Sequence, residues 1–165
     1  MPGDVPPNGD VAPTAATEGP PHGITLIDHA KISALVAEGD RPVAKVLEAC
    51  KITDNQWSDS TTYWMTRMGD DVAKSGVDAK IPIVYSDAFG KAQDAIKPLP
   101  EMSPEEWATL TVEIQTIGNP ARPLATRNLS QADFLRLARH WARTLSSDPA
   151  QNKRFFATYV SLQPA

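Results

Sequence analysis

The chain has 165 residues, of which 41% are apolar, and a formal net charge of −4. This length and composition allow the packed core of one domain or of two small ones. The single cysteine excludes an intrachain disulfide, no apolar run approaches the ~20 residues of a membrane-spanning helix, and the negative charge gives no general affinity for nucleic acid or anionic membranes.

Residues 1–24 are predicted to be a disordered tail. Residues 1–23 contain six prolines and four glycines, with no Phe, Trp or Tyr and almost no large aliphatic side chain. Such a segment cannot bury enough apolar surface to offset the entropy that is lost on ordering. It also lacks the basic and apolar regions of a secretory signal, since the first Lys or Arg is Lys31. Together with the lone cysteine, this predicts a cytoplasmic protein without a membrane partner.

The first predicted helical module covers residues 25–98 and contains four helices. Thr25 with Asp28 gives a helix start of the Ser/Thr-x-x-acid type, and Gly39 ends that helix. A short second helix follows Pro42, because proline is favoured at the start of a helix. The apolar face of the first helix consists of Ile32, Leu35 and Val36.

The third helix of this module opens with a capping box formed by Thr53 and Gln56. The fourth helix is predicted over residues 78–97, with Pro82 tolerated in its first turn. Both helices have apolar positions at helical spacing, which predicts one buried face for each. These positions are Trp57, Thr61, Trp64, Met65 and Met68 in the third helix, and Ile81, Tyr85, Ala88, Phe89, Ala92 and Ile96 in the fourth.

The second predicted module covers residues 99–165, after a linker at residues 97–101 that is stiffened by two prolines. Ser103 is expected to cap its first helix, because a proline follows at the first helical position and a glutamate at the third. Ser130 opens the third helix and Asp148 opens the last one. The apolar stripe of the third helix is Phe134, Ala138, Trp141, Ala142 and Leu145.

The two modules repeat one pattern. Residues 52–57 (ITDNQW) are echoed 77 residues later by residues 129–134 (LSQADF), and Trp64 and Asp71 match Trp141 and Asp148 at the same offset. A repeat of this kind indicates one small structural unit used twice. The predicted fold is therefore all-α, with two tandem four-helix modules in which Trp64 and Trp141 occupy equivalent buried positions.

The sequence predicts no catalytic or metal site and no cofactor. The three histidines, His22, His29 and His140, are far apart and have no second ligand at metal-binding spacing. Two carboxylate pairs occur, at residues 70–71 and 105–106. Their members Asp71 and Glu106 precede or open helices, so helix capping explains them better than acid–base catalysis. The chain is therefore predicted not to be an enzyme.

One surface is a candidate binding site, because residues 120–165 hold 7 Lys/Arg and only 2 Asp, whereas residues 1–119 hold 9 Lys/Arg and 18 Asp/Glu. Four cationic or titratable residues follow i, i+3, i+4, i+7 spacing in the third helix of the second module, opposite its apolar stripe. This face is expected to point to solvent in an isolated module. Two interpretations stay open: recognition of a partner, or an ordinary solvated face. The four residues are Arg136, Arg139, His140 and Arg143.

The start of the third helix resembles a known kind of module. Residues 51–57 with Trp64, and residues 128–134 with Trp141, have an Ile/Leu-Thr/Ser helix start followed by two aromatic residues seven positions apart. This pattern is similar to small helical modules of myxobacterial and related proteins associated with type VI secretion. The resemblance implies an adaptor, chaperone or structural accessory without catalytic residues. The chain departs from it at Lys51 and Asn128, where glycine is expected, and at Phe134, where tryptophan is expected.

These observations lead to one expected function and two alternatives. The expected function is a non-enzymatic protein-interaction module, an adaptor or accessory of a bacterial secretion system, whose basic face favours a protein partner with an acidic surface. A helix-turn-helix-like DNA-binding protein is an alternative, because residues 42–68 and 120–145 each read as two helices joined by a short turn. The negative net charge and the nearly uncharged helix of the first module speak against nucleic acid. A toxin-neutralising immunity protein is the other alternative, and the oligomeric state stays open.

Overall fold

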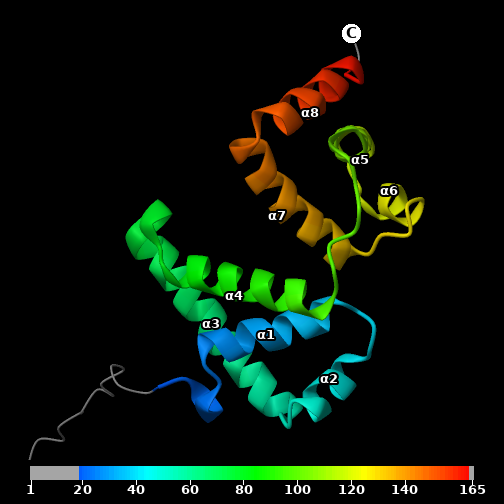
Figure 1. Ribbon diagram of the computed structural model, residues 1–165. Coiled ribbons are helices and arrows are strands. Elements are labelled where there is room, and N and C mark those ends of the chain that lie inside the picture. The colour runs from blue at the N-terminus through cyan, green and yellow to red at the C-terminus, as the bar shows by residue number, and fades with distance from the viewer. Residues whose placement is uncertain (1–18, 164–165) are drawn as a thin grey trace, which may run out of the picture.

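The computed structural model describes residues 19–163, and this part of the chain is helical and contains no strand (Figure 1). The predicted all-α class is confirmed. Most of the predicted tail, residues 1–18, lies outside the described residues. The helices are α1 (Leu26–Ala37), α2 (Val43–Ala49), α3 (Asp54–Ser75), α4 (Ile81–Ile96), α5 (Pro104–Ile117), α6 (Ala121–Ala125), α7 (Gln131–Ser147) and α8 (Pro149–Ser161), with single 3-10 turns at η1 (Pro21–Gly23) and η2 (Gly76–Asp78).

The predicted helix starts are confirmed by their side-chain caps. Complete capping boxes open α3, α5 and α7, where Thr53, Ser103 and Ser130 accept a backbone N–H and the residue three positions later reaches back. Each such cap contributes about 1 kcal/mol to helix stability. The starts of these helices are therefore fixed by local sequence rather than by tertiary contacts.

Two aspartates cap the last helix of each half, as the sequence predicts. Asp148 directly precedes α8, and its side chain accepts the backbone N–H groups of Ala150 and Gln151 at 2.9 and 3.1 Å. Asp71 lies inside α3 instead, and its carboxylate reaches across η2 to accept the N–H of Ile81 at 2.7 Å. One capping function is thus performed from two different positions, because α3 has 22 residues and α7 has 17.

Two predicted boundaries are wrong. The fourth helix begins at Ile81 rather than at residue 78, because residues 76–78 form the η2 turn. The expected disorder does not extend to residues 21–24, which fold against α3. The backbone carbonyl of the buried Ile24 accepts the indole N–H of Trp64 at 3.0 Å, and His22 contacts Asp59 at 2.8 Å.

The main apolar core lies in the second half of the chain. Trp141 is only 4% exposed, as the sequence predicts, and the Trp107 and Phe134 rings pack 5.7 Å apart beside it. Burial of large aromatic side chains is a major source of stability in a small helical unit. The buried core residues are Trp107, Ala108, Leu110, Leu124, Leu137, Trp141 and Phe155.

The first half buries its apolar residues less completely, which corrects two predictions. Trp64 is half-buried rather than buried, and Met65 is 61% exposed. The six positions predicted to face inward on the fourth helix are also only half-buried, whereas the fully buried residues of α4 are Gly90 and Gln93. The reason is that α4 packs on several sides, against α1, α3 and α7, so no single face of it is enclosed.

The two halves meet where α4 packs against α7. Figure 1 shows α1–α4 grouped in the lower part of the view and α5–α8 in the upper part. Gly90 permits the close approach, because a Cβ atom at this position would lie 3.0 Å from the Nε atom of Arg139. Within each half the first helix packs along the last one, α1 along α4 and α5 along α8.

Candidate functional site

The basic face predicted for partner binding is the face of α7 that packs against the first half. Arg136 and Arg139 both contact α4, so the face that is expected to point to solvent in an isolated module is covered at these two residues by the first half. Sequence reasoning considered the second module in isolation, and the four positions are indeed opposite its own apolar stripe. The other half of the chain covers them.

Arg136 is the most completely enclosed of the four, with 0% of its side chain exposed. Its Nε and Nη2 atoms donate to the backbone carbonyl of Gln93 at 3.1 and 2.8 Å. Nη2 also forms an ion pair with Glu38, and Nη1 lies 3.4 Å from Asp133. A buried guanidinium needs such partners because desolvation of an unpaired charge costs several kcal/mol. Arg136 is therefore a structural residue that holds the halves together.

Arg139 extends the same contact toward the surface. Its Nη1 atom donates to the side-chain oxygen of Gln93 at 2.7 Å, and its Nη2 atom forms an ion pair with Asp94 at 3.0 Å. About a quarter of the side chain is exposed. Most hydrogen-bond donors of the Arg139 guanidinium are therefore used in contacts within the chain.

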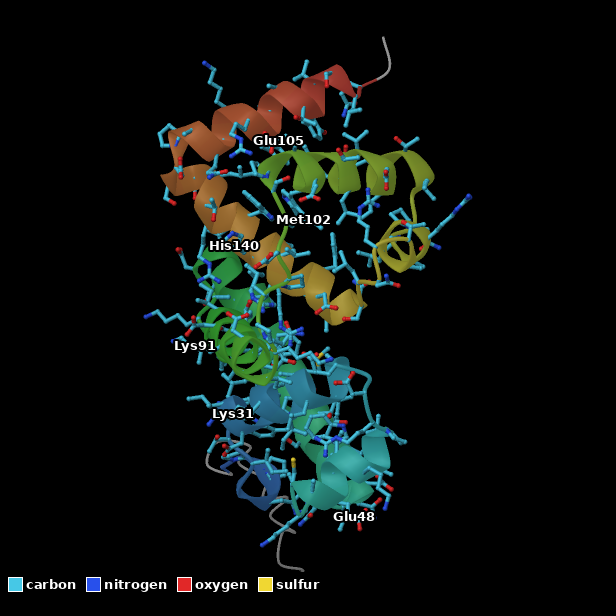
Figure 2. All side chains as sticks on the ribbon, turned by 45° about the vertical axis from the view of Figure 1, so that its right-hand side comes forward. Lys31, Glu48, Lys91, Met102, Glu105 and His140 are labelled. Carbon is cyan, nitrogen blue, oxygen red and sulfur yellow. The ribbon has the colours of Figure 1, made fainter. Side chains whose placement is uncertain are left out.

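His140 and Arg143 are the members of the face that reach the surface. His140 is half-buried, with its Nε2 atom 3.4 Å from Thr144 and its ring edge-on to Trp141. Arg143 is exposed, and its Nε atom donates to the carbonyl of Arg139. Together with Asp94 and Leu99, they line a cavity of about 330 Å³ (His140 is labelled in Figure 2). Partner binding by these two residues stays a prediction.

A buried histidine–serine pair lies in the first half. The Nδ1 atom of His29 is 3.1 Å from the hydroxyl oxygen of Ser60, and the imidazole ring stacks on Trp57 at 4.5 Å. Burial lowers the pKa of His29, because desolvation disfavours the charged ring. Ser60 is completely buried, so no substrate can reach its hydroxyl. The pair is a satisfied polar contact inside the helical packing rather than a nucleophile and its base.

The carboxylates of α5 act as helix caps and ion-pair partners. Hydrogen bonds from Ser103 hold the pKa of Glu106 below its usual value, and the guanidinium of Arg154, 2.8 Å away, does the same for Glu105. Lowered pKa values keep both groups charged near neutral pH, which is the opposite of what a general acid needs. Between residues 19 and 163, no three His, Cys, Asp or Glu side chains are grouped so that they could hold a metal ion.

A surface groove between α1 and α4 was not predicted from the sequence. It has a volume of about 480 Å³ and is mostly apolar. Ile27 at one end is 47% exposed, and Val84 opposite is 45% exposed. The apolar residues that line it are Ile27 and Leu35 from α1, and Val84, Ala88, Ala92, Ala95 and Ile96 from α4.

The sequence predicts four of these groove residues as core positions, because helical spacing alone does not distinguish a buried face from an open groove. Leu35, Ala88, Ala92 and Ile96 are half-buried instead. One signal in the sequence marks the difference. Lys31 interrupts the apolar face of α1 between Ile27 and Leu35, and a charged residue at that spacing is typical of a rim rather than of a core.

The described helices include none that is both long enough and apolar enough to cross a lipid bilayer. Comparison of the whole chain with models of protein families, with curated proteins and with solved structures finds no match.

Proposed function

We propose that this protein is a non-enzymatic protein-interaction module and that the α1–α4 groove is its docking surface. The groove is the observation that supports the proposal. Apolar side chains that stay half-exposed on a helical surface are costly in water, and concave apolar surfaces of this size serve mainly to bind other molecules. The basic face of α7 contributes little to this function, because Arg136 and Arg139 are occupied within the chain.

We also propose that the two halves are copies of one unit that have diverged in function. The order of helices, the packing of the first helix along the last, and the capping box of the third helix are the same in both halves. The groove is not shared. The offset is 78 rather than 77 for the first helices, where Thr25 and Asp28 match Ser103 and Glu106, so Ile27 and Leu35 of α1 correspond to Glu105 and Glu113 of α5. The first copy is thus the binding copy and the second, with its larger core, is the stabilising copy.

Service as an adaptor or accessory of a bacterial secretion machine is the cellular role that we propose, and only the resemblance of the helix starts supports it. The DNA-binding alternative loses support, because the arginines of its recognition helix face α4 and its first helix, α6, has only five residues. Protein recognition through the groove requires neither of these features.

Loss of partner capture by a groove variant tests the proposal. Val84→Glu places a charge in the groove, and the matched control Phe156→Glu changes an equally exposed apolar residue, on α8. Each purified, tagged protein is incubated with extract of the source organism, and captured proteins are compared by mass spectrometry. The proposal expects a protein retained by the wild type and by Phe156→Glu but lost with Val84→Glu, and direct binding of that purified protein in calorimetry. Equal capture by all three would contradict it.

A further inference from the structure

Resting on the proposed function, we infer that the occupant of the α1–α4 groove is an amphipathic helix of a partner protein, with acidic residues flanking its apolar stripe. The inference depends on the shape of the groove, on the charge of its rim, and on the contrast with the corresponding seam of the second half.

The groove has the shape of a trough that accepts one helix. α1 and α4 run in the same direction, since their C-terminal ends meet where Lys97 contacts Asp40 at 2.8 Å (Figure 1). The lining residues of α4 extend from Val84 to Ile96, which is about 18 Å at ~1.5 Å per residue. That length matches a helix of about 12 residues. Amphipathic helices commonly lay an apolar face into grooves of this kind.

The floor of the trough consists of small side chains. Ala88, Ala92 and Ala95 follow i, i+4, i+7 spacing on α4 and leave room for large apolar side chains of an incoming helix. Ile27 and Leu35 form the opposite wall on α1. A partner helix with Leu or Phe at the same spacing would fill the trough above the alanines and beside this wall.

The rim of the groove is net positive. Lys31 on α1 is exposed, and Lys91 on α4 forms an ion pair with Asp87 at 2.7 Å, so one positive charge is left in excess. Figure 2 shows Lys31 and Lys91 on the same side of the first half. Acidic residues beside the apolar stripe of a partner helix would lie opposite these ammonium groups, which favours encounter and sets register.

The corresponding seam of the second half is closed by polar contacts. Glu105 of α5 forms two hydrogen bonds of 2.8 Å with Arg154 of α8, and the hydroxyl of Tyr159 donates to Gln115 at 2.9 Å. Glu113 is engaged by Arg127 in the same half. The outer side chains of α5 and α8 are therefore polar and paired with each other, whereas those of α1 and α4 are apolar and line an open groove.

A second copy of this chain fits the groove less well than an acidic helix. In a two-fold dimer the same rim would face itself and bring lysines of the two copies together. Among the described residues that line the groove, Asp87 is the one with a carboxylate, and Lys91 of the same helix already forms an ion pair with it. Like charges across an interface oppose association.

Two helix-stabilised peptides of about 14 residues provide the test. Both have Leu at i, i+4, i+7 and i+11, and they differ only in having Glu or Lys beside these positions. Their binding to the full-length protein is measured by fluorescence anisotropy. At about 0.1 M salt we expect the Glu peptide to bind at least about tenfold more tightly than the Lys peptide. At about 1 M salt the difference should largely vanish, because the Debye length falls from ~10 to ~3 Å.

Variants locate the bound peptide. Val84→Glu should weaken the Glu peptide at least about tenfold, and Lys31→Glu should reverse the preference between the peptides. Lys153→Glu, an exposed charge reversal on α8, is the matched control and should change neither affinity. Circular dichroism and thermal unfolding of each variant exclude misfolding as the cause. Unchanged binding in Val84→Glu, or equal binding of both peptides, overturns the inference.

Other occupants give distinct results. Light scattering that shows a dimer dissolved by Val84→Glu would assign the groove to a second copy. Sedimentation with phosphatidylserine vesicles that depends on Val84 and Lys31, without peptide binding, would assign it to a lipid surface. If neither peptide binds but Val84→Glu still loses a native protein partner, the helical occupant is wrong and the proposed function stands. If that partner is retained as well, both fail.

Discussion

Arg136 of α7 and Glu38, at the end of α1, form an ion pair although they are 98 residues apart in the sequence, and their side chains are 0% and 3% exposed. Lys97, from the linker between the halves, lies 3.6 Å from the same carboxylate. The contact between the two halves is therefore centred on charge rather than on apolar packing. Both charges are buried, so each depends on the other.

Removal of one partner of this pair should be much more damaging than removal of both. Arg136→Met leaves the Glu38 carboxylate buried with Lys97 alone, and we expect a loss of about 3–5 kcal/mol in the free energy of unfolding. The double variant Arg136→Met with Glu38→Leu should lose clearly less than the sum of the two single variants. Urea denaturation of the four proteins measures this. Strict additivity would mean that the pair does not couple the halves.

Lys51→Gly should stabilise the protein. Lys51 and Asn128 occupy the same position after α2 and α6 and both have positive φ, 58° and 54°. In each case the next residue donates to the carbonyl five positions earlier, Ile52 to Leu47 and Leu129 to Leu124 at 3.0 Å. Glycine adopts this conformation without strain, so we expect a gain of about 1 kcal/mol for Lys51→Gly. Asn128→Gly should gain less, because asparagine tolerates positive φ, and thermal unfolding with Lys51→Ala as the control separates these cases.

Truncation of Trp64 and Trp141, which the sequence repeat pairs, should have unequal effects. Trp141→Ala removes a buried core side chain and should cost about 3–5 kcal/mol. Trp64 is half-buried, so Trp64→Ala should cost roughly half as much, including its hydrogen bond to Ile24. Met65→Ala, at an exposed position beside it, should change stability by less than about 0.5 kcal/mol. Equal losses for both tryptophans would show that the first half is as tightly packed as the second.

Stability should fall as the pH drops below 6.5, the ordinary pKa of a histidine, because of His29. Its pKa is lowered in the folded state, so the unfolded chain binds the proton first. The contribution of the neutral ring to the free energy of unfolding is complete above the pKa of His29 in the unfolded chain. It decreases as the pH falls toward the lower pKa of His29 in the folded protein. His29→Asn keeps an uncharged partner for Ser60 and should flatten this decrease. Urea denaturation at several pH values measures both proteins, and identical pH profiles would exclude His29 as the origin.

Binding to random-sequence DNA should be absent at micromolar protein, even at low salt. The reason is that Arg136 and Arg139 are bound to the first half and the net charge is negative. Arg143→Glu is the correct surface variant for any residual binding. Arg136→Glu is unsuitable, because it places a second carboxylate beside the buried Glu38. Micromolar duplex binding that Arg143→Glu abolishes would restore the DNA-binding alternative.

The local sequence predicted the starts of the helices well. The capping boxes at Thr53, Ser103 and Ser130 involve residues three positions apart, so their hydrogen bonds are encoded within one turn. Lys51 and Asn128 stand where the resemblance implies glycine, and both backbones are left-handed there. Signals of this range need no knowledge of the tertiary structure.

Long-range packing was not predictable in the same way. Arg136 was expected on an open face because the helical period relates it only to its own module. Its partners Glu38 and Gln93 lie 98 and 43 residues away, and no spacing rule reaches that far. The groove is not predicted for a similar reason: Ala88 and Ala92 have the period of a core face, and the one contrary signal, Lys31, lies on α1, which only the tertiary structure places beside them.

The parallel arrangement of α1 and α4 also orients any helix that lies between them. Each helix carries a positive partial charge at its N-terminal end and a negative one at its C-terminal end, so the two macrodipoles add along the groove. An incoming helix that runs antiparallel to both places its positive N-terminal end beside their negative C-terminal ends, which is the favourable arrangement. The backbone of this protein therefore selects the chain direction of its partner before any side chain is recognised. The partner's N-terminal flank would then emerge beside Lys97, near the second half of the molecule.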